Sequence, residues 1–254
     1  MAAQAKLQLR QVYKSYQTDQ GVLRVLAGVD MVACDGEFVS VIGPSGCGKS
    51  TLLEVVANLQ VPDQGEVLVD GSPPTKTMCA YMPQKDMLFP WRRVIDNITL
   101  GLEVSGASRR EAREQVAPLL KAFGLAGFEQ SYPFQLSGGM RQRAALLRTV
   151  VQQRALMLLD EPLGALDSLT RTDMQLWLES VWERYRWTVV LVTHDIREAV
   201  YLSDTVYVLS PRPARVVARV EVNLPRPRSL ELIASAEAAR LEMHILSSLH
   251  RQSS

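Results

Sequence analysis

The stretch FVSVIGPSGCGKSTLLEVVANL, residues 38–59, decides the fold of this chain. It begins with a short β-branched run at 38–42, passes through a glycine-rich turn at 43–51, and continues as a helix-like apolar run. The turn satisfies the pattern G-x-x-x-x-G-K-[ST], in which glycines let the backbone fold closely around phosphate oxygens. A chance glycine-rich turn is the alternative. Because the strand and the helix that the pattern requires are both present, we interpret 43–51 as a phosphate-binding loop.

Each position of this loop has an expected role. The ammonium of Lys49 would reach the β- and γ-phosphates of a nucleotide, and the hydroxyl of Ser50 would be a ligand of Mg²⁺. Successive N–H groups and the start of the following helix supply the rest of a concave anion site. The contributing residues are Gly43, Pro44, Ser45, Gly46, Cys47, Gly48, Lys49, Ser50 and Thr51.

The remaining apolar runs predict an α/β fold with a largely parallel sheet. The runs at 155–159, 188–193 and 205–209 have the length of buried strands, and each is followed by charged or turn residues. Ligands bind at that edge of open α/β sheets. The N-terminal part differs, since apolar residues alternate around Leu7 and Leu9, and again around Val67 and Val69, as in antiparallel strands.

Two regions have a helical pattern. Residues from Ser108 to Phe123 place apolar side chains on one face, and we predict an inserted helical subdomain at about 85–150. Residues 226–254 are expected to form a linker and one amphipathic helix from Leu230 to Leu249.

Composition narrows the class of protein. The chain has 254 residues, 47% of them hydrophobic, and a net charge of +1, which gives no argument for nucleic-acid binding. Its three cysteines are scattered, as expected of reduced thiols. The sequence has neither the apolar core of a signal peptide nor a run long enough to span a bilayer. We expect a cytosolic protein, or one held at a membrane by a partner.

Polar residues follow two of the predicted strands. Asp160 and Glu161 end the run ALMLLDE, where an aspartate can hold Mg²⁺ and a neighbouring carboxylate can orient or deprotonate water. An acidic strand-to-turn boundary is the alternative. His194 follows the run at 188–193 and could hydrogen-bond a γ-phosphate oxygen; otherwise it is a polar neighbour of Asp195 at a helix start.

A second glycine-opened helix start lies at LSGGM, residues 136–140. Met140, Ala144, Leu147 and Val151 fall on one helix face, so Ser137, Gly138 and Gly139 begin a helix whose first N–H groups are unpaired. Such a terminus binds anions. Because the loop at 43–51 already surrounds the phosphates from its own side, this start makes sense if it closes over the γ-phosphate from another molecule.

Taken together, GPSGCGKST, Gln84, LSGGM, LMLLDE, GALD at 164–167 and His194 resemble the nucleotide-binding subunits of ABC (ATP-binding cassette) transporters. The resemblance covers about residues 6–225, the expected ATP-binding domain, in the expected order. It implies an α/β fold with a RecA-like P-loop NTPase core and a parallel sheet, an N-terminal antiparallel β subdomain and an inserted α-helical subdomain.

The resemblance also implies a homodimer that forms when ATP binds. Two copies would pair head to tail with two ATP molecules between them. Ser137, Gly138 and Gly139 of one copy would cap the γ-phosphate held by the loop of the other, and Asp167 would lie at the dimer seam.

Further roles follow from the same resemblance. Tyr16 would stack on adenine, with Tyr13 the weaker candidate, and Gln84 would reach Mg²⁺ or the attacking water. Glu161 would be the general base and His194 the γ-phosphate contact. Gln84 would also relay the nucleotide state to a membrane partner.

The implied function is ATP hydrolysis that energises an importer at the cytoplasmic face of the inner membrane. Integral membrane permease subunits would dock at 85–97, where Met87 to Trp91 form an apolar cluster; folding of this cluster onto the core is the alternative. An extracytoplasmic solute-binding protein would act indirectly. The resemblance favours nitrate, sulfonates or taurine, or pyrimidines as the solute. A soluble ABC ATPase unconnected with transport, and a P-loop small-molecule kinase, are the alternatives.

The segment after 209 is rich in arginine and proline. We expect its arginines to be solvated on edge strands and a linker, with weak attraction to an anionic membrane surface as the alternative. They are Arg212, Arg215, Arg219, Arg226 and Arg228.

Overall fold

The structure is a computed structural model that describes residues 4–75 and 77–251. Its strands are β1 (Ala5–Thr18), β2 (Gly21–Cys34), β3 (Phe38–Ile42), β4 (Gln64–Val69), β5 (Cys79–Met82), β6 (Leu156–Asp160), β7 (Thr188–Val192), β8 (Thr205–Leu209) and β9 (Val216–Glu221). Its α-helices are α1 (Lys49–Val56), α2 (Val94–Ile98), α3 (Leu100–Val104), α4 (Arg109–Ala122), α5 (Gly138–Val150), α6 (Ser168–Tyr185), α7 (Ile196–Leu202), α8 (Leu230–Ile233) and α9 (Ala236–His250), with a 3₁₀ turn at Pro133–Gln135.

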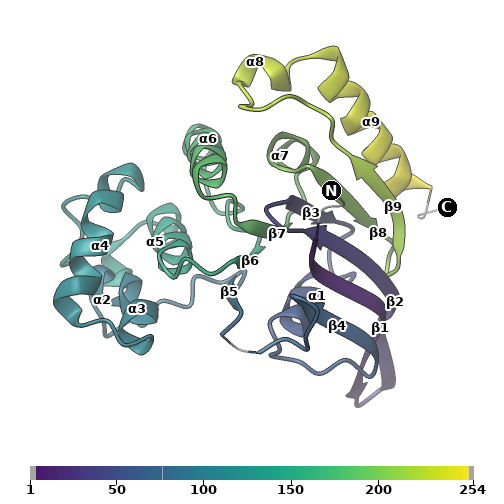
Figure 1. Ribbon diagram of the computed structural model, residues 1–254, viewed down its shortest axis with the longest axis horizontal. Coiled ribbons are helices and arrows are strands. Elements are labelled where there is room, and N and C mark those ends of the chain that lie inside the picture. The colour runs from purple at the N-terminus through teal and green to yellow at the C-terminus, as the bar shows by residue number, and fades with distance from the viewer. Residues whose placement is uncertain (1–3, 76, 252–254) are drawn as a thin grey trace.

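The strands form two sheets. The larger sheet has the order β5-β6-β7-β3-β8-β9 and is parallel except for β9, which runs antiparallel to β8. The smaller sheet has the order β2-β1-β4 and is antiparallel. Leu7 pairs with Val69 and Leu9 with Val67, which confirms the antiparallel pattern predicted at the N-terminus. Figure 1 shows the smaller sheet beside α1, away from helices α2–α5.

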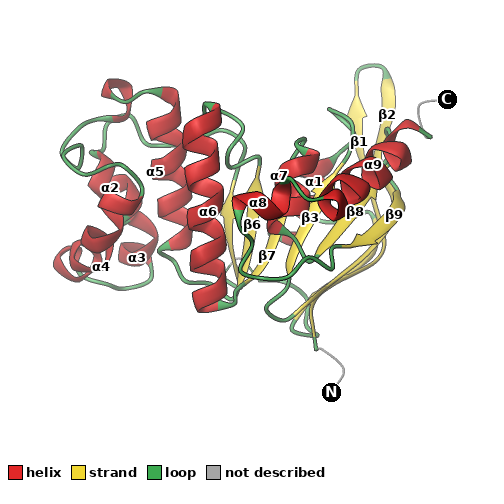
Figure 2. Ribbon diagram, turned by 90° about the horizontal axis from the view of Figure 1, so that it is seen from above, coloured by secondary structure: helices red, strands yellow, loops and turns green. Residues whose placement is uncertain are grey.

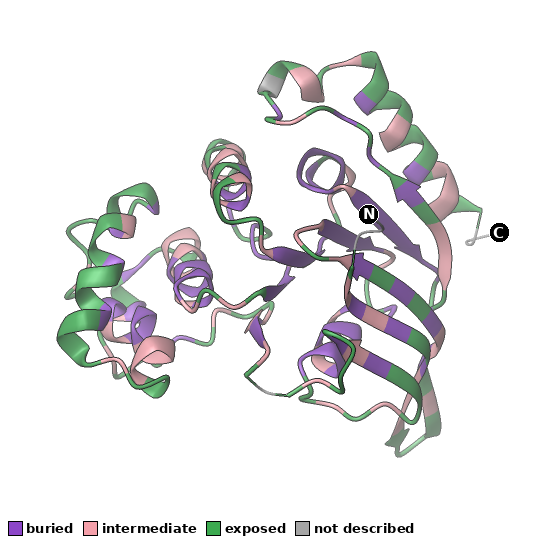
Figure 3. Ribbon diagram, in the orientation of Figure 1, coloured by how far each residue is buried: buried purple, intermediate pink, exposed green. Residues whose placement is uncertain are grey.

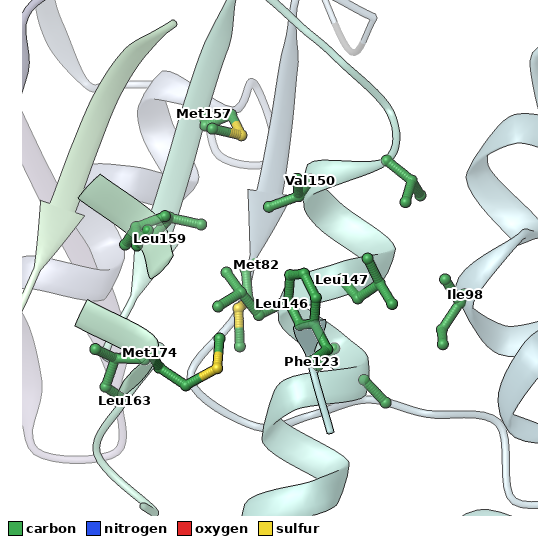
Figure 4. Close-up of a cluster of buried hydrophobic side chains, with 14 of the residues drawn as sticks. Met82, Ile98, Phe123, Leu146, Leu147, Val150, Met157, Leu159, Leu163 and Met174 are labelled. Carbon is green, nitrogen blue, oxygen red and sulfur yellow. The ribbon is translucent and has the colours of Figure 1, made fainter. Parts of the chain in front are cut away.

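The central strands are buried on both faces, as their continuous apolar runs predict. In β6, Leu156 and Leu158 pack toward α1 and the smaller sheet. Met157 and Leu159 pack on the opposite side, among residues of α2, α5 and α6. Figure 4 shows Met157 and Leu159 on that side, with Phe123 and Leu147 in the same apolar cluster. Each central strand is therefore fixed by two separate cores, which holds its carboxyl end in place.

The helices of the 94–150 segment gather at one end of the molecule, as Figure 2 shows. Helix α4 begins at the predicted place because Ser108 and Glu111 form a capping box, in which each side chain accepts from the other residue's backbone N–H. Figure 3 shows that α4 has a largely exposed outer face, while α1 and α7 are mostly buried. The boundaries at 85–150 and 6–225 stay predictions.

The single helix predicted from Leu230 to Leu249 is wrong. The chain forms α8 and α9, because the Ser235 hydroxyl accepts a hydrogen bond from the Ala238 N–H and starts a new helix there. The apolar face of α9 packs as expected, since Ile245 is buried among residues of α7, β8 and β9.

The prediction of solvated arginines is also wrong for Arg226 and Arg228. Arg226 forms ion pairs with Glu179 at 3.1 Å and with Asp204 at 2.9 Å, and its guanidinium lies over the Trp182 ring. Arg228 is 4% exposed and donates to three main-chain carbonyls near the end of α7. Arg228 is buried and Arg226 is half-buried, because partners distant in sequence satisfy both charges. The segment after β9 is thus tied to α6 and α7 and is not a free linker.

Candidate active site

The predicted phosphate loop connects β3 to α1. Gly46 and Gly48 have φ values of 73° and 123°, a region that favours glycine. A Cβ on Gly48 would lie 2.6 Å from the Val25 side chain, so space as well as conformation requires glycine there. No side chain caps the first turn of α1, and its N–H groups are left for an anion.

Lys49 lies within this loop. Its ammonium donates hydrogen bonds to the Gly43 carbonyl at 2.8 Å and to the Pro44 carbonyl at 3.0 Å. Its side chain is buried. The charge of Lys49 is therefore held where a phosphate in the loop would meet it. Cys47 turns its thiol into the core beneath the loop, so only its backbone can serve a ligand.

A cavity of about 370 Å³ opens beside the loop. Such a volume suits a small organic ligand. Most of its wall comes from predicted site residues, and Tyr16 belongs to this wall whereas Tyr13 does not. The lining residues are Tyr16, Leu23, Val25, Ser45, Gly46, Gly48, Lys49, Ser50, Thr51, Gln84, Glu161 and Arg212.

Asp160 ends β6, directly before the lining residue Glu161, and is buried. Burial raises the pKa of its carboxyl, and a hydrogen bond from the Ser50 hydroxyl partly offsets this shift. One carboxylate oxygen, Oδ1, has no hydrogen-bond partner among the described residues. A divalent cation would supply that partner and favour the charged carboxylate, so the pair Asp160 and Ser50 fits Mg²⁺.

The groups that could bind a metal ion at this site are of more than one chemical type. Residues 4–75 and 77–251 contain no group of three or more His, Cys, Asp or Glu side chains arranged for a metal ion. A cation held by Asp160 would therefore depend on hydroxyl and phosphate oxygens as well, which is the ligand chemistry that Mg²⁺ prefers.

Glu161 follows directly and faces the cavity. Its Oε2 lies 3.2 Å from Gln84 Nε2 and 3.3 Å from His194 Nδ1. Its backbone has a φ of 48°, and its N–H donates to the Val192 carbonyl at 2.9 Å. The Glu161 carbonyl also accepts from Gln142 Nε2 at 3.2 Å. Glu161 thus has an uncommon backbone conformation, and one oxygen of its carboxylate contacts both the Gln84 amide and the His194 imidazole.

These residues come from neighbouring strand ends. Gln84 follows β5, Glu161 follows β6 and His194 follows β7, and these strands are adjacent in the sheet. The carboxyl ends of parallel strands meet at one edge, so the topology brings together groups that are far apart in sequence.

The predicted second anion site lies outside this cavity. It consists of Ser137, Gly138 and Gly139. Ser137 and Gly138 are exposed, and none of the three residues lines the cavity. Ser137 is the N-cap of α5, where its hydroxyl oxygen accepts from the Met140 N–H at 3.2 Å. Its hydroxyl hydrogen remains able to donate to an anion.

Asp167 is likewise exposed and separate from the cavity. It is the N-cap of α6, and its carboxylate accepts from the Thr170 N–H at 3.0 Å. That backbone hydrogen bond lowers the pKa of Asp167. The structure thus brings one group of predicted residues together in the cavity and leaves the other group on the surface of the same chain.

Sequence reasoning missed three lining residues, Leu23, Val25 and Arg212. Leu23 and Val25 belong to β2, which was not predicted as a strand. Arg212 lies in the turn between β8 and β9, where the Ala214 N–H donates to the Val25 carbonyl at 2.8 Å. No local signal marks such a long-range pairing.

The site defines a class. A glycine-rich loop after β3, a buried aspartate at the end of β6 and a carboxylate beside it form the arrangement of a P-loop protein that hydrolyses nucleoside triphosphates.

Comparison with known proteins gives the family. The family model for the ABC transporter matches residues 26–164. An aliphatic sulfonates import ATP-binding protein of Agrobacterium fabrum is 44% identical over 241 residues, covering 94% of this chain and 82% of its own. A formylaminopyrimidine import ATP-binding protein of Halalkalibacterium halodurans is 40% identical over 216 residues, covering 85% of each.

The fold agrees with a solved structure. The dimeric structure of the ABC transporter cassette MJ0796 has a TM-score of 0.79 and 30% identity, covering 86% of this chain and 100% of that one. A further structure of that cassette is a post-hydrolysis state bound to ADP and Pi, with a TM-score of 0.79 and 29% identity. The chain belongs to the ABC transporter family as an ATP-binding subunit, and it is an ATPase.

Proposed function

We propose that this protein is the ATPase subunit of an importer for a small solute, with a sulfonate or a pyrimidine as the favoured class and nitrate as a further one. The relatives named as sulfonate and formylaminopyrimidine import proteins support this proposal. The single observation that carries the chemistry is the meeting of Gln84 and His194 at Glu161 Oε2.

In the proposed reaction, Glu161 is the general base. Its carboxylate takes a proton from the water that attacks the γ-phosphorus, while Gln84 and His194 orient the carboxylate and the water. The loop and Lys49 hold the phosphates, and His194 also contacts a γ-phosphate oxygen. Tyr16 stacks on the adenine.

Ser50, Gln84 and Asp160 would hold Mg²⁺. When bound, this cation neutralises charge on the β- and γ-phosphate oxygens. The unpartnered Asp160 oxygen supports this assignment.

The proposal includes a homodimer. Ser137, Gly138, Gly139 and Asp167 of one copy would complete the site of the other when ATP binds. Ser137, Gly138 and Asp167 are exposed, and none of the four residues lines the cavity of its own chain, which supports this arrangement. The dimeric structure of the related cassette supports it as well.

Permease subunits would dock on the 85–97 region. Leu88 is buried in the core, but Trp91 is 72% exposed, and its ring contacts that of Phe89 in a tilted arrangement with the ring centroids 5.2 Å apart. Exposed aromatic residues are common anchors in protein interfaces. No helix in the described part of the chain could cross a membrane, so the proposed place at the cytoplasmic face of the membrane depends on this docking.

The substitution Glu161→Gln tests the function. It keeps the shape of the side chain and removes the base, so we expect ATP to bind with unchanged affinity while turnover falls by about 10²- to 10⁴-fold. Steady-state phosphate release and equilibrium ATP binding would be measured on the same preparations. Turnover at the wild-type rate would overturn the assignment of the base.

A further inference from the structure

The turn between β8 and β9 is built against the nucleotide cavity. The Ala214 N–H donates to the Val25 carbonyl at 2.8 Å, and the Ala214 carbonyl accepts from the Ala27 N–H at 3.0 Å. At the base of the turn, the Ser210 hydroxyl accepts from the Arg215 N–H at 3.0 Å. The turn is therefore fixed to β2, a strand of the other sheet.

This pairing places Arg212 in the cavity wall. Arg212 lines the cavity together with Tyr16, Leu23 and Val25, although it lies far from all of them in sequence. Tyr16 and Leu23 are paired across β1 and β2. Arg212 thus joins an aromatic and aliphatic surface, whereas Ser45 to Thr51 form the phosphate side.

The Arg212 side chain has no competing role. It is exposed, and within residues 4–75 and 77–251 it forms no hydrogen bond or ion pair with another side chain or carbonyl. Arg226 and Arg228, by contrast, are held by carboxylates and carbonyls. A planar guanidinium next to an apolar wall is suited to stack on an aromatic ring.

We propose that Arg212 binds the nucleoside half of ATP, with its guanidinium against the purine base that Tyr16 also contacts. This inference rests on the proposed function, in which the cavity binds ATP, and adds a residue to that binding site. It makes the β8–β9 turn a part of the nucleotide site, and it adds a second cation to a lining in which Lys49 serves the phosphates.

The test compares Arg212→Ala with Arg215→Ala. Arg215 lies in the same turn, is exposed, and does not line the cavity. Equilibrium titrations with ATP and with inorganic triphosphate would be made on both variants and on the wild type. We expect Arg212→Ala to weaken ATP binding about threefold to tenfold and to leave triphosphate binding unchanged, because only a contact with the base is lost. Arg215→Ala should bind both ligands as the wild type does.

Unchanged ATP affinity in Arg212→Ala would overturn the inference, and so would an equal loss for ATP and triphosphate, which would assign Arg212 to the phosphates. In kinetics, the variant should raise KM for ATP with kcat unchanged. Failure of the wild type itself to bind ATP would instead refute the proposed function.

Discussion

The starts of α1 and α5 are both glycine-rich helix termini, yet they lie in the molecule in opposite ways. The start of α1 has no side-chain cap, lines a cavity and carries a buried lysine. The start of α5 is exposed, lines no part of that cavity, and is capped by its own Ser137. This difference fits our proposal that the start of α1 binds phosphate within its own chain, whereas the start of α5 binds it only when a second copy is present.

Outside the cavity, the largest effect on turnover is expected at Ser137. We predict that Ser137→Ala lowers turnover roughly 10- to 100-fold, because a hydrogen bond to a charged phosphate is lost from the partner's site. ATP binding to the isolated chain should not change, since the phosphate loop is intact. Turnover and binding are measured separately.

Ser108→Ala is the matched control. Ser108 caps α4 as Ser137 caps α5, so both variants should lose about 1 kcal/mol of stability. Only the Ser137 variant should lose turnover. Equal turnover in the two variants would mean that α5 needs Ser137 as a helix cap alone.

A smaller effect, on stability, is expected at Glu198 in helix α7. This glutamate is buried, and burial raises its pKa to about 7, while the Thr193 hydroxyl donates to it at 2.7 Å. Between its ordinary pKa of 4.5 and about 7, the folded chain keeps a proton that the unfolded chain loses. Stability therefore falls as pH rises through this window and stays lower above it.

Glu198→Gln removes the titrating group and keeps an acceptor for Thr193. We predict that the variant is about 2–3 kcal/mol more stable than the wild type at pH 8 and similar to it at pH 5. Urea unfolding at both pH values measures this difference. The exposed Glu237→Gln should leave the pH dependence as it is. A wild-type stability that does not decline from pH 5 to pH 7 would contradict the account.

The smallest effect on turnover is expected at Trp91, on the exposed side of the molecule. We predict that Trp91→Ala changes basal ATP hydrolysis by less than about twofold but weakens capture of the permease by about tenfold, since exposed tryptophans are interface anchors. Phe134 is 73% exposed and serves as the control. Equal capture by the two variants would place the docking surface elsewhere.

Local pattern was sufficient for the elements that position the phosphates. The strand at 38–42 was predicted at its observed bounds, because a β-branched run before a glycine loop has few alternatives. Residues 188–193 and 205–209 were predicted as strands because they are continuous apolar runs of buried-strand length, and β7 and β8 lie there. Helix α4 was predicted because apolar residues between Ser108 and Phe123 fall on one helix face, and the structure adds a capping box at its start.

The features that the sequence did not predict depend on contacts between residues that are distant in the chain. The strand β2 pairs with β1 through several register shifts, which blur the alternation that marks a strand. Arg226 was expected in solvent, but ion pairs with Glu179 and Asp204 hold its side chain in a half-buried position. Arg212 enters the cavity because the Ala214 backbone pairs with Val25. In each case the deciding partner is distant in the chain.

Our main proposal is that each ATP lies between two copies of the chain, bound by the phosphate loop of one copy and by the start of α5 of the other. Its most direct test is the mass of Glu161→Gln in solution with ATP, measured by light scattering after size-exclusion chromatography, with and without the added substitution Ser137→Glu. We expect ATP to double the mass of Glu161→Gln and ADP to leave it unchanged. Adding Ser137→Glu should abolish the doubling, because a carboxylate would then face the γ-phosphate. A single variant that remains monomeric with ATP, or a dimer that is indifferent to Ser137→Glu, would contradict it.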